Sequence, residues 1–227
     1  MSEWTYEDIA GIIDHALLQP TMTDDELRNG CEWARSAGVA TVCIKPYAVK
    51  TAATILNNSK VKVGTVIGFP HGGVSTAIKV EESKEVIQNG AGEIDMVVNI
   101  GKVLSRDWTY VALEIAAVMS VAKEHHAILK VIFETSLLKD EHKIRLCEIC
   151  GTLGVHFVKT STGYGDGGAT DHDIRLMRRH SPAKVQIKAS GGIRTFARLL
   201  ELRDLGVTRI GTTSSAAILQ EVRTRLG

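Results

Sequence analysis

The feature that most constrains the fold is a regular alternation between two kinds of segment. Eight short runs rich in β-branched and other apolar residues recur along the chain, and amphipathic stretches with charged faces fill the gaps between them. The runs cover residues 12–17, 39–44, 61–67, 93–99, 128–134, 156–161, 185–190 and 209–214. Runs of this kind are typical of buried strands, and the stretches between them have helical periodicity. The sequence therefore predicts eight strands that alternate with helices.

Local signals mark where several of these helices begin and end. Thr23 stands before the acidic residues 24–26, and Thr170 stands before two aspartates within residues 171–173. A threonine hydroxyl can accept a hydrogen bond from the first turn of a helix, and carboxylates there complement the helix dipole. Glycines close the predicted helices shortly before the next strand, as in SAGVA and CGTLGV. No linker or change in composition divides the chain, so residues 1–227 are predicted to form one domain.

Strands that are apolar along nearly their whole length are typical of parallel sheets that helices cover on both faces. Eight such units predict a closed (β/α)8 barrel of the TIM type, with a short extra helix at its N-terminus. An open, doubly wound sheet is the competing architecture. It would place a glycine-rich turn after the first strand, but the turn after residue 17 reads LQPTMTDDE and contains no glycine. The barrel is therefore favoured, and dinucleotide binding is not expected.

The charge balance and the cysteine content exclude several classes of protein. There are 27 Lys plus Arg against 26 Asp plus Glu, a net charge of +1, whereas proteins that bind nucleic acid are strongly basic. The chain contains neither a run of about 18 apolar residues nor a signal-peptide core, so no membrane association is expected. Four scattered cysteines agree with a reducing compartment, and we expect the protein to be cytoplasmic.

Cys147 and Cys150 form a CxxC pattern of the kind that occurs in metal and redox sites. The pair lies in KIRLCEICG, where helical spacing puts both thiols on one apolar face. No second ligand pair accompanies it, and no other His, Cys or Asp cluster has the sequence spacing of a zinc site. The CxxC is therefore predicted to belong to a buried helix, and neither a metal nor a cofactor is expected.

Charged residues interrupt four of the predicted strands. Asp95, Lys159 and Lys188 lie within strands, and Glu134 closes another. A buried charge without a partner is costly, so each of these groups needs a partner, a shifted pKa or a path to water. In a barrel of this type the active site lies at the C-terminal ends of the strands. The four residues are therefore candidates for function.

Three of these charges are expected to meet inside the barrel. Asp95 and Lys159 lie on the fourth and sixth strands, and alternate strands contribute side chains to the same layer. Lys188 lies on the adjacent seventh strand. Desolvation and repulsion between neighbouring ammonium groups favour a neutral amine, and a neutral lysine beside a carboxylate can form a Schiff base with a carbonyl compound. The alternative is that both lysines extend to solvent and that Asp95 is only their counter-ion.

Two loops that contain glycines and hydroxyl groups follow the last two strands. Gly191 and Gly192 come after the seventh strand, and Gly211, Thr213 and Ser214 end the eighth. Barrels commonly bind phosphate at these two loops, because the N–H groups at a helix N-terminus point toward the anion. Each loop alone would be an ordinary turn and helix cap. The two together predict a phosphate site.

Longer segments spread over nearly the whole chain can be compared with known families. They are IDHALLQP (13–20), TVCIKP (41–46), VIGFPHG (66–72), GEIDMVVNIGKV (92–103), KVIFETSLL (130–138), FVKTSTGYGDGGAT (157–170), IKASGGIRT (187–195) and RIGTTS (209–214). Together they resemble the deoxyribose-phosphate aldolase family. The resemblance implies a class I aldolase that reversibly cleaves the phosphosugar 2-deoxy-D-ribose 5-phosphate to D-glyceraldehyde 3-phosphate and acetaldehyde without a metal. A homo-oligomer, dimer or tetramer, is expected.

The resemblance also implies roles for individual residues. Lys159 would form the Schiff base, Asp95 would handle protons and Lys188 would tune the nucleophile. The residues that would hold the phosphate are Gly191, Gly192, Gly211, Thr213 and Ser214. Those that would line the substrate pocket are Asp14, Thr162 and Phe69, with Glu134 joining the polar network.

Two positions depart from the pattern of the family. Ala16 stands where the family usually has a hydroxyl-bearing residue, and Lys45 stands where a neutral residue is commoner. Both departures are expected to affect substrate affinity before they affect the type of reaction. Two alternatives stay open at this point. One is a related Schiff-base aldolase or transaldolase-like enzyme for another phosphosugar, and the other is a phosphate-binding barrel without catalytic activity.

Overall fold

The computed structural model describes residues 4–226, and its strands form one closed barrel. All neighbouring strands are parallel, and β8 pairs with β1 to close the ring. The strands are β1 (Ile13–Leu17), β2 (Thr41–Ile44), β3 (Lys62–Ile67), β4 (Glu93–Val97), β5 (Ile128–Ile132), β6 (Phe157–Lys159), β7 (Gln186–Ser190) and β8 (Arg209–Thr212). Each lies inside one of the predicted runs, so the predicted (β/α)8 barrel is confirmed.

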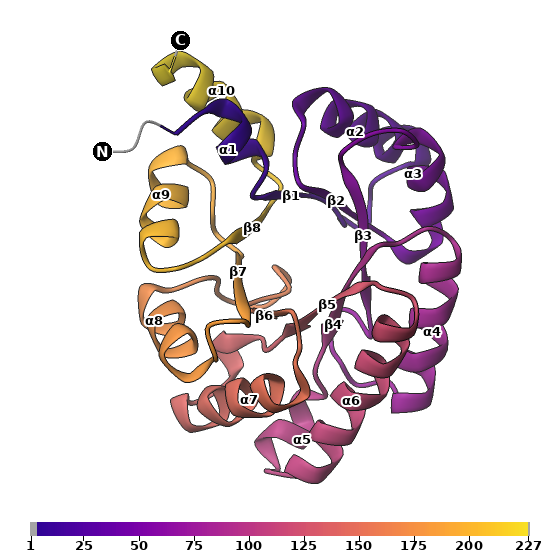
Figure 1. The fold of residues 1–227 in the computed structure, drawn as a ribbon, viewed down its shortest axis with the longest axis vertical. Coiled ribbons are helices and arrows are strands. Elements are labelled where there is room, and N and C mark those ends of the chain that lie inside the picture. Colours follow the sequence, from indigo (N-terminus) through magenta and orange to yellow (C-terminus); the bar gives the residue numbers. More distant parts are fainter. Residues whose placement is uncertain (1–3, 227) are drawn as a thin grey trace.

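Helices lie outside the strands on all sides of the barrel (Figure 1). They are α1 (Tyr6–Ala10), α2 (Asp24–Ala37), α3 (Val49–Ile55), α4 (Thr76–Gln88), α5 (Ile100–Leu104), α6 (Trp108–Glu124), α7 (Asp140–Leu153), α8 (Asp171–His180), α9 (Phe196–Asp204) and α10 (Ser215–Leu226). Short 3-10 turns follow β2 at Pro46–Ala48 and β5 at Thr135–Leu137. The predicted extra N-terminal helix is α1, which packs against α10.

The residues that predicted the helix boundaries cap the helices in the structure. The hydroxyl of Thr23 accepts a hydrogen bond from the N–H of Glu26 at 3.3 Å, and the Glu26 carboxylate accepts one from the Thr23 N–H at 2.7 Å. This is a capping box, and Thr170 caps α8 through its hydroxyl in a similar way. Helices α2 and α7 end at Gly38 and Gly154, whose φ angles of 69° and 70° are left-handed.

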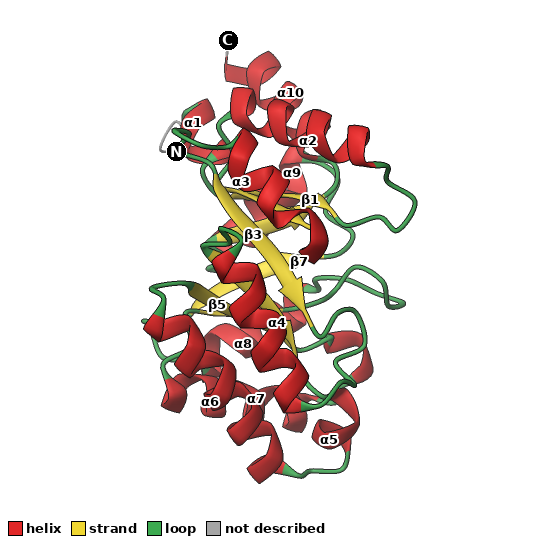
Figure 2. Ribbon diagram, turned by 90° about the vertical axis from the view of Figure 1, so that its right-hand side faces the viewer, coloured by secondary structure: helices red, strands yellow, loops and turns green. Residues whose placement is uncertain are grey.

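The barrel interior and the layer between strands and helices are both packed, as expected for strands covered on two faces. Figure 2 shows the inclined strands in the middle of the molecule, between helices. Cys147 and Cys150 are fully buried on α7, as predicted, and burial raises the pKa of the Cys147 thiol to about 11. Within residues 4–226, no helix combines the length and the apolar character needed to cross a bilayer.

Candidate active site

A layer of charged side chains crosses the interior of the barrel. We call it the charged layer, and its members are Asp14 on β1, Glu93 and Asp95 on β4, Lys130 on β5, Lys159 on β6, Lys188 on β7 and Arg209 on β8. The strand register brings them together, because Lys159 pairs with Lys188 and Asp95 pairs with Lys130 across neighbouring strands. Residues paired in this way point to the same face of a sheet, and here that face is the barrel interior.

Asp95 lies at the centre of the charged layer and is fully buried. Its Oδ2 accepts hydrogen bonds from Lys159 Nζ at 2.8 Å and from Lys188 Nζ at 2.7 Å. Its Oδ1 accepts a third from Lys130 Nζ at 2.7 Å. Burial would raise the pKa of this carboxyl, but the three ammonium groups outweigh it and hold the pKa well below its usual range. The structure thus brings the three residues with expected catalytic roles into direct contact.

The two lysines that share Asp95 differ in their acid–base properties. Burial lowers the pKa of Lys159, Asp95 opposes this effect, and the positive charge of Lys188 lowers the pKa further. Lys188 is equally desolvated, but it donates hydrogen bonds to both Asp14 and Asp95, and these two carboxylates raise its pKa. Lys159 is therefore the amine that loses its proton more readily, while Lys188 stays cationic.

Lys130 and Arg209 belong to the charged layer, and the sequence did not single them out. Lys130 Nζ lies 2.7 Å from a carboxylate oxygen of Glu93 as well as from Asp95, and these carboxylates raise its pKa against burial. Arg209 donates hydrogen bonds to Asp14 at 2.7 Å and to Glu93 at 3.0 Å. A signal for Lys130 was present, because it interrupts the same apolar run that Glu134 closes.

Counting the charges of this layer explains why one lysine can be neutral. Three carboxylates face four basic side chains, so the layer is electrically balanced when one base has given up its proton. The pKa directions identify this base as Lys159, since those of Lys130, Lys188 and Arg209 are all raised. Balanced charge is the condition under which buried ionised groups are tolerated.

A cavity of about 230 Å³ opens above the charged layer at the C-terminal ends of the strands. We call it the substrate cavity. The predicted site residues that line it are Asp14, Lys159, Thr162, Lys188, Gly191, Gly192, Gly211 and Thr213. Asp95 lies below this surface and reaches it through Lys159 and Lys188. Phe69 and Ser214 are not among the lining residues. Phe69 instead packs edge-on against Tyr164, which does line the cavity, with ring centroids 5.3 Å apart.

The loops after β7 and β8 form one end of the substrate cavity. Gly191 and Gly192 have φ angles of 87° and 76°, a conformation that favours glycine. A Cβ atom on Gly191 would lie 2.8 Å from the backbone of Gly168, so this position also needs glycine for space. Arg194 lines the same end and had not been expected there. The loop after β8 leads directly into α10, whose first residue is Ser215.

The two departures from the family pattern lie in different places. Ala16 lines the substrate cavity, where a side-chain hydroxyl could otherwise point. Lys45 lies outside the lining and donates hydrogen bonds to the carbonyls of Met22 at 3.0 Å and Pro20 at 3.3 Å. Lys45 therefore holds the loop between β1 and α2, part of which forms a wall of the cavity.

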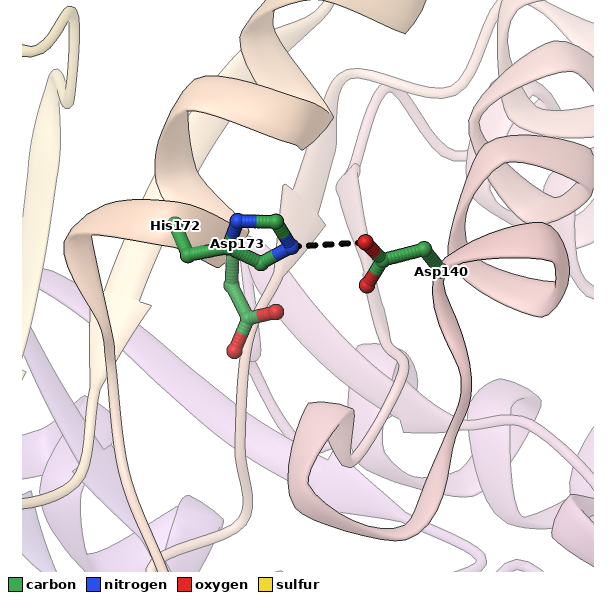
Figure 3. A group of neighbouring side chains, drawn as sticks. All are labelled: Asp140, His172 and Asp173. Atoms are coloured by element: carbon green, nitrogen blue, oxygen red, sulfur yellow. Dashed lines mark hydrogen bonds and ion pairs between the residues drawn. The ribbon is translucent and has the colours of Figure 1, made fainter.

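Asp140, His172 and Asp173 form a cluster of three potential metal ligands outside the barrel, between α7 and α8. Figure 3 shows His172 facing the Asp140 carboxylate, and His172 Nε2 lies 2.7 Å from it. Lys143 already pairs with both carboxylates of the cluster, because its Nζ lies 2.5 Å from Asp173 and 3.3 Å from Asp140. A cation in that position disfavours a metal ion, and we assign the cluster to packing of α7 against α8.

Comparisons with known proteins agree with this geometry. A family model described as DeoC/LacD family aldolase matches residues 9–208. The chain is 52% identical over 227 residues to a deoxyribose-phosphate aldolase of Rhodopirellula baltica, covering 100% of this chain and 94% of the relative. It is 45% identical over 215 residues to a deoxyribose-phosphate aldolase of Thermococcus kodakarensis, covering 94% and 96%. A solved tetrameric deoxyribose phosphate aldolase from Aeropyrum pernix matches with a TM-score of 0.90 and 30% identity, covering 97% and 93%. The chain therefore belongs to the DeoC/LacD family of aldolases.

Proposed function

We propose that this protein is a class I aldolase that reversibly cleaves 2-deoxy-D-ribose 5-phosphate to D-glyceraldehyde 3-phosphate and acetaldehyde. The observation that carries the proposal is a buried lysine, Lys159, with a lowered pKa, which lines a cavity and lies 2.8 Å from the carboxylate of Asp95. The relatives that share about half of the sequence over nearly its full length bear the name of this activity.

The reaction begins with covalent attachment of the sugar. The neutral amine of Lys159 attacks the C1 aldehyde of the open-chain sugar, and the carbinolamine that forms loses water to give an iminium ion. Lys188 remains an ammonium group beside Lys159 and can donate a proton to the departing hydroxyl group. The iminium then withdraws electrons from the bond between C2 and C3.

Cleavage requires that the hydroxyl group on C3 lose its proton. Asp95 accepts this proton through a water molecule, and the electron pair of the C2–C3 bond moves into the iminium to give an enamine. The oxygen on C3 becomes the aldehyde of glyceraldehyde 3-phosphate. The pKa of Asp95 is strongly lowered, so the carboxyl holds the proton only briefly and returns it to C2 of the enamine. Hydrolysis of the resulting iminium consumes water, releases acetaldehyde, restores the amine of Lys159 and returns a proton to Lys188.

The phosphate group would be held where the loops after β7 and β8 meet. Backbone N–H groups at Gly191, Gly192 and Gly211 can approach an anion closely because no Cβ atom intervenes. The hydroxyl of Thr213 lines the same end of the cavity. Binding of the phosphate at this end, with C1 on Lys159, would orient the bond that breaks.

A coupled assay tests the function directly. The protein is incubated with 2-deoxy-D-ribose 5-phosphate, NADH and an alcohol dehydrogenase that reduces acetaldehyde. We expect NADH consumption that depends on the phosphosugar and is insensitive to EDTA, because the iminium is the electron sink. Cleavage of a different phosphosugar alone would contradict the proposed substrate. Binding of phosphosugars without cleavage of any would show a non-catalytic barrel.

Replacement of Lys188 by leucine is expected to move the acid limb of the kcat/KM profile to higher pH. Lys159 must be neutral to react, and the charge of Lys188 lowers its pKa, so removal of that charge raises the pKa of Lys159. The measurement is kcat/KM against pH for the wild type, for Lys188→Leu and for Lys188→Arg, which keeps the charge. An acid limb that does not move in Lys188→Leu would show that Lys188 does not tune the nucleophile.

We also propose that residues 1–227 act as one domain and that the chain assembles into a homo-oligomer. The support for an oligomer is that the Aeropyrum pernix structure is described as tetrameric. Light scattering coupled to size-exclusion chromatography is expected to give a mass that is a multiple of 24.6 kDa. A mass of one chain over the working concentration range would contradict this assembly.

A further inference from the structure

The mouth of the barrel contains a second cavity, which the proposed reaction does not use. We call it the side cavity; it has a volume of about 320 Å³. It lies over the loops after β3, β4, β5 and β6, whereas the substrate cavity lies over β6, β7, β8, β1 and β2. Residues lining only the side cavity are Pro70, His71, Ile100, Glu134, Leu137 and Gly165. Thr162 and Tyr164 line both cavities and therefore stand between them.

Tyr164 is held in this dividing position by contacts with two other loops, those after β1 and β3, and by one contact within its own loop. Its hydroxyl donates a hydrogen bond to the carbonyl of Leu18 at 2.7 Å, across the mouth of the barrel. Its ring packs edge-on against Phe69, and its backbone N–H donates to the hydroxyl of Thr162 at 3.0 Å. Burial raises the pKa of the phenol, so the hydroxyl keeps the proton that it donates. The residue, which is 42% exposed, thus stands between the two cavities and is held by its hydroxyl at one end and by its backbone at the other.

The base of this wall is fixed by Glu134. Glu134 is not a glycine, yet it has a φ of 57°, and strained backbone of this kind persists where surrounding contacts enforce it. Its buried carboxylate accepts hydrogen bonds from the backbone N–H of Thr162 at 3.2 Å and from the Thr162 hydroxyl. The Glu134 carboxylate therefore positions Thr162, and the Thr162 hydroxyl in turn positions the backbone of Tyr164.

The side cavity suits a small alkyl group. Pro70, Ile100, Leu137 and the ring of Tyr164 give it apolar surfaces, and the Glu134 carboxylate is engaged by Thr162. With C1 on Lys159 and the phosphate at β7 and β8, carbon C2 of the substrate lies at the Lys159 end of the substrate cavity. The loop that carries Thr162 and Tyr164 continues directly from Lys159. A substituent on C2 would therefore meet the wall that separates the two cavities.

We infer that Tyr164 determines the size of the donor aldehyde, because its side chain closes the substrate cavity against the side cavity. The wall admits acetaldehyde and excludes donors with an alkyl group on C2. This inference rests on the proposed function and adds a specificity-determining residue to it.

The test uses the carbon–carbon bond-forming direction, with glyceraldehyde 3-phosphate as the acceptor and acetaldehyde, propanal or butanal as the donor. In Tyr164→Ala we expect the ratio of kcat/KM for butanal to that for acetaldehyde to rise about tenfold or more, the effect of opening a pocket to additional methylene groups. Tyr164→Phe keeps the ring and loses only the hydrogen bond to Leu18, so the ratio should stay at the wild-type value. Tyr47→Ala is the matched control, since Tyr47 is an exposed tyrosine that bonds Asp24 and lines neither cavity.

A second measurement does not depend on turnover. Each variant is incubated with equal concentrations of butanal and acetaldehyde, the adducts are reduced with borohydride, and the ratio of the two adducts on Lys159 is measured by peptide mass spectrometry. An increase in the butanal adduct in Tyr164→Ala supports the inference. An unchanged ratio in both experiments overturns it, even if the variant is otherwise less active. A wild-type protein that forms no product from acetaldehyde would instead refute the proposed function.

Discussion

Replacement of Lys159 by alanine is expected to lower kcat for deoxyribose phosphate cleavage by roughly four orders of magnitude or more, the scale seen when a covalent nucleophile is removed. Every step after substrate binding depends on the iminium, and no other basic side chain of the charged layer can replace the amine. Lys130 and Lys188 are held as ammonium ions by two or more carboxylates, and a protonated amine has no lone pair for the carbonyl. Initial rates in the coupled assay measure the loss.

The same prediction has a covalent readout. Borohydride reduction of the wild type in the presence of substrate should leave a stable mass increase on the peptide that contains Lys159. Lys159→Ala should show no increase on any peptide, while circular dichroism shows an intact barrel. A trapped adduct on Lys130 or Lys188 in the wild type would show that Lys159 is not the nucleophile. Full activity of Lys159→Ala would exclude the Schiff-base route.

Replacement of Lys130 by methionine is expected to lower the free energy of unfolding by about 3–5 kcal/mol, the cost of removing one partner from a buried ion pair. Lys130 is fully buried, and its ammonium group contacts Asp95 and Glu93 at 2.7 Å and Asp14 at 3.5 Å. Methionine fills a similar volume, so the loss comes from charge and not from a void. With Lys130 removed and Lys159 neutral, only the cations of Lys188 and Arg209 face the three carboxylates of the layer.

Lys159→Met is the matched control for this stability measurement. Lys159 lies on the neighbouring strand at similar burial, but its pKa is lowered and its loss leaves Asp95 with two ammonium partners. We therefore expect a clearly smaller loss in urea unfolding for Lys159→Met, although it inactivates the enzyme. Equal losses for the two variants would contradict the assignment of Lys130 to stability and of Lys159 to reactivity.

These two lysines show how one layer of charges can serve two purposes. Lys130 and Arg209 neutralise Asp14 and Glu93, so most of the buried charge is permanently paired. The layer has one base more than it has carboxylates, and Lys159 is the base that can lose its proton, because its surroundings lower its pKa. The reactive amine is thus a consequence of the balance in the whole layer and not only of its neighbour Lys188.

The sequence was sufficient for the architecture because the relevant signals are local. Eight apolar runs, the caps at Thr23 and Thr170 and the glycines that end helices each act within a few residues of themselves. Asp95, Lys159 and Lys188 could be identified from a local signal as well, because each is a charged residue within an apolar run that is predicted to be buried. Family resemblance supplied the chemistry that would use them.

Only the tertiary structure decided how these charges are paired. The sequence marks Asp14 only as a pocket residue. In the fold Asp14 does line the substrate cavity, and it also binds both Lys188 and Arg209. The sequence gives no reason to connect Arg209 with Glu93, which lie more than a hundred residues apart. Nor does it indicate that Phe69 packs against Tyr164 and that Tyr164, not Phe69, lines the cavity. A strand shows which of its side chains face inward, but the pKa of each depends on partners that other strands bring. Closure of the barrel sets those distances, and electrostatic energy follows from distance and burial.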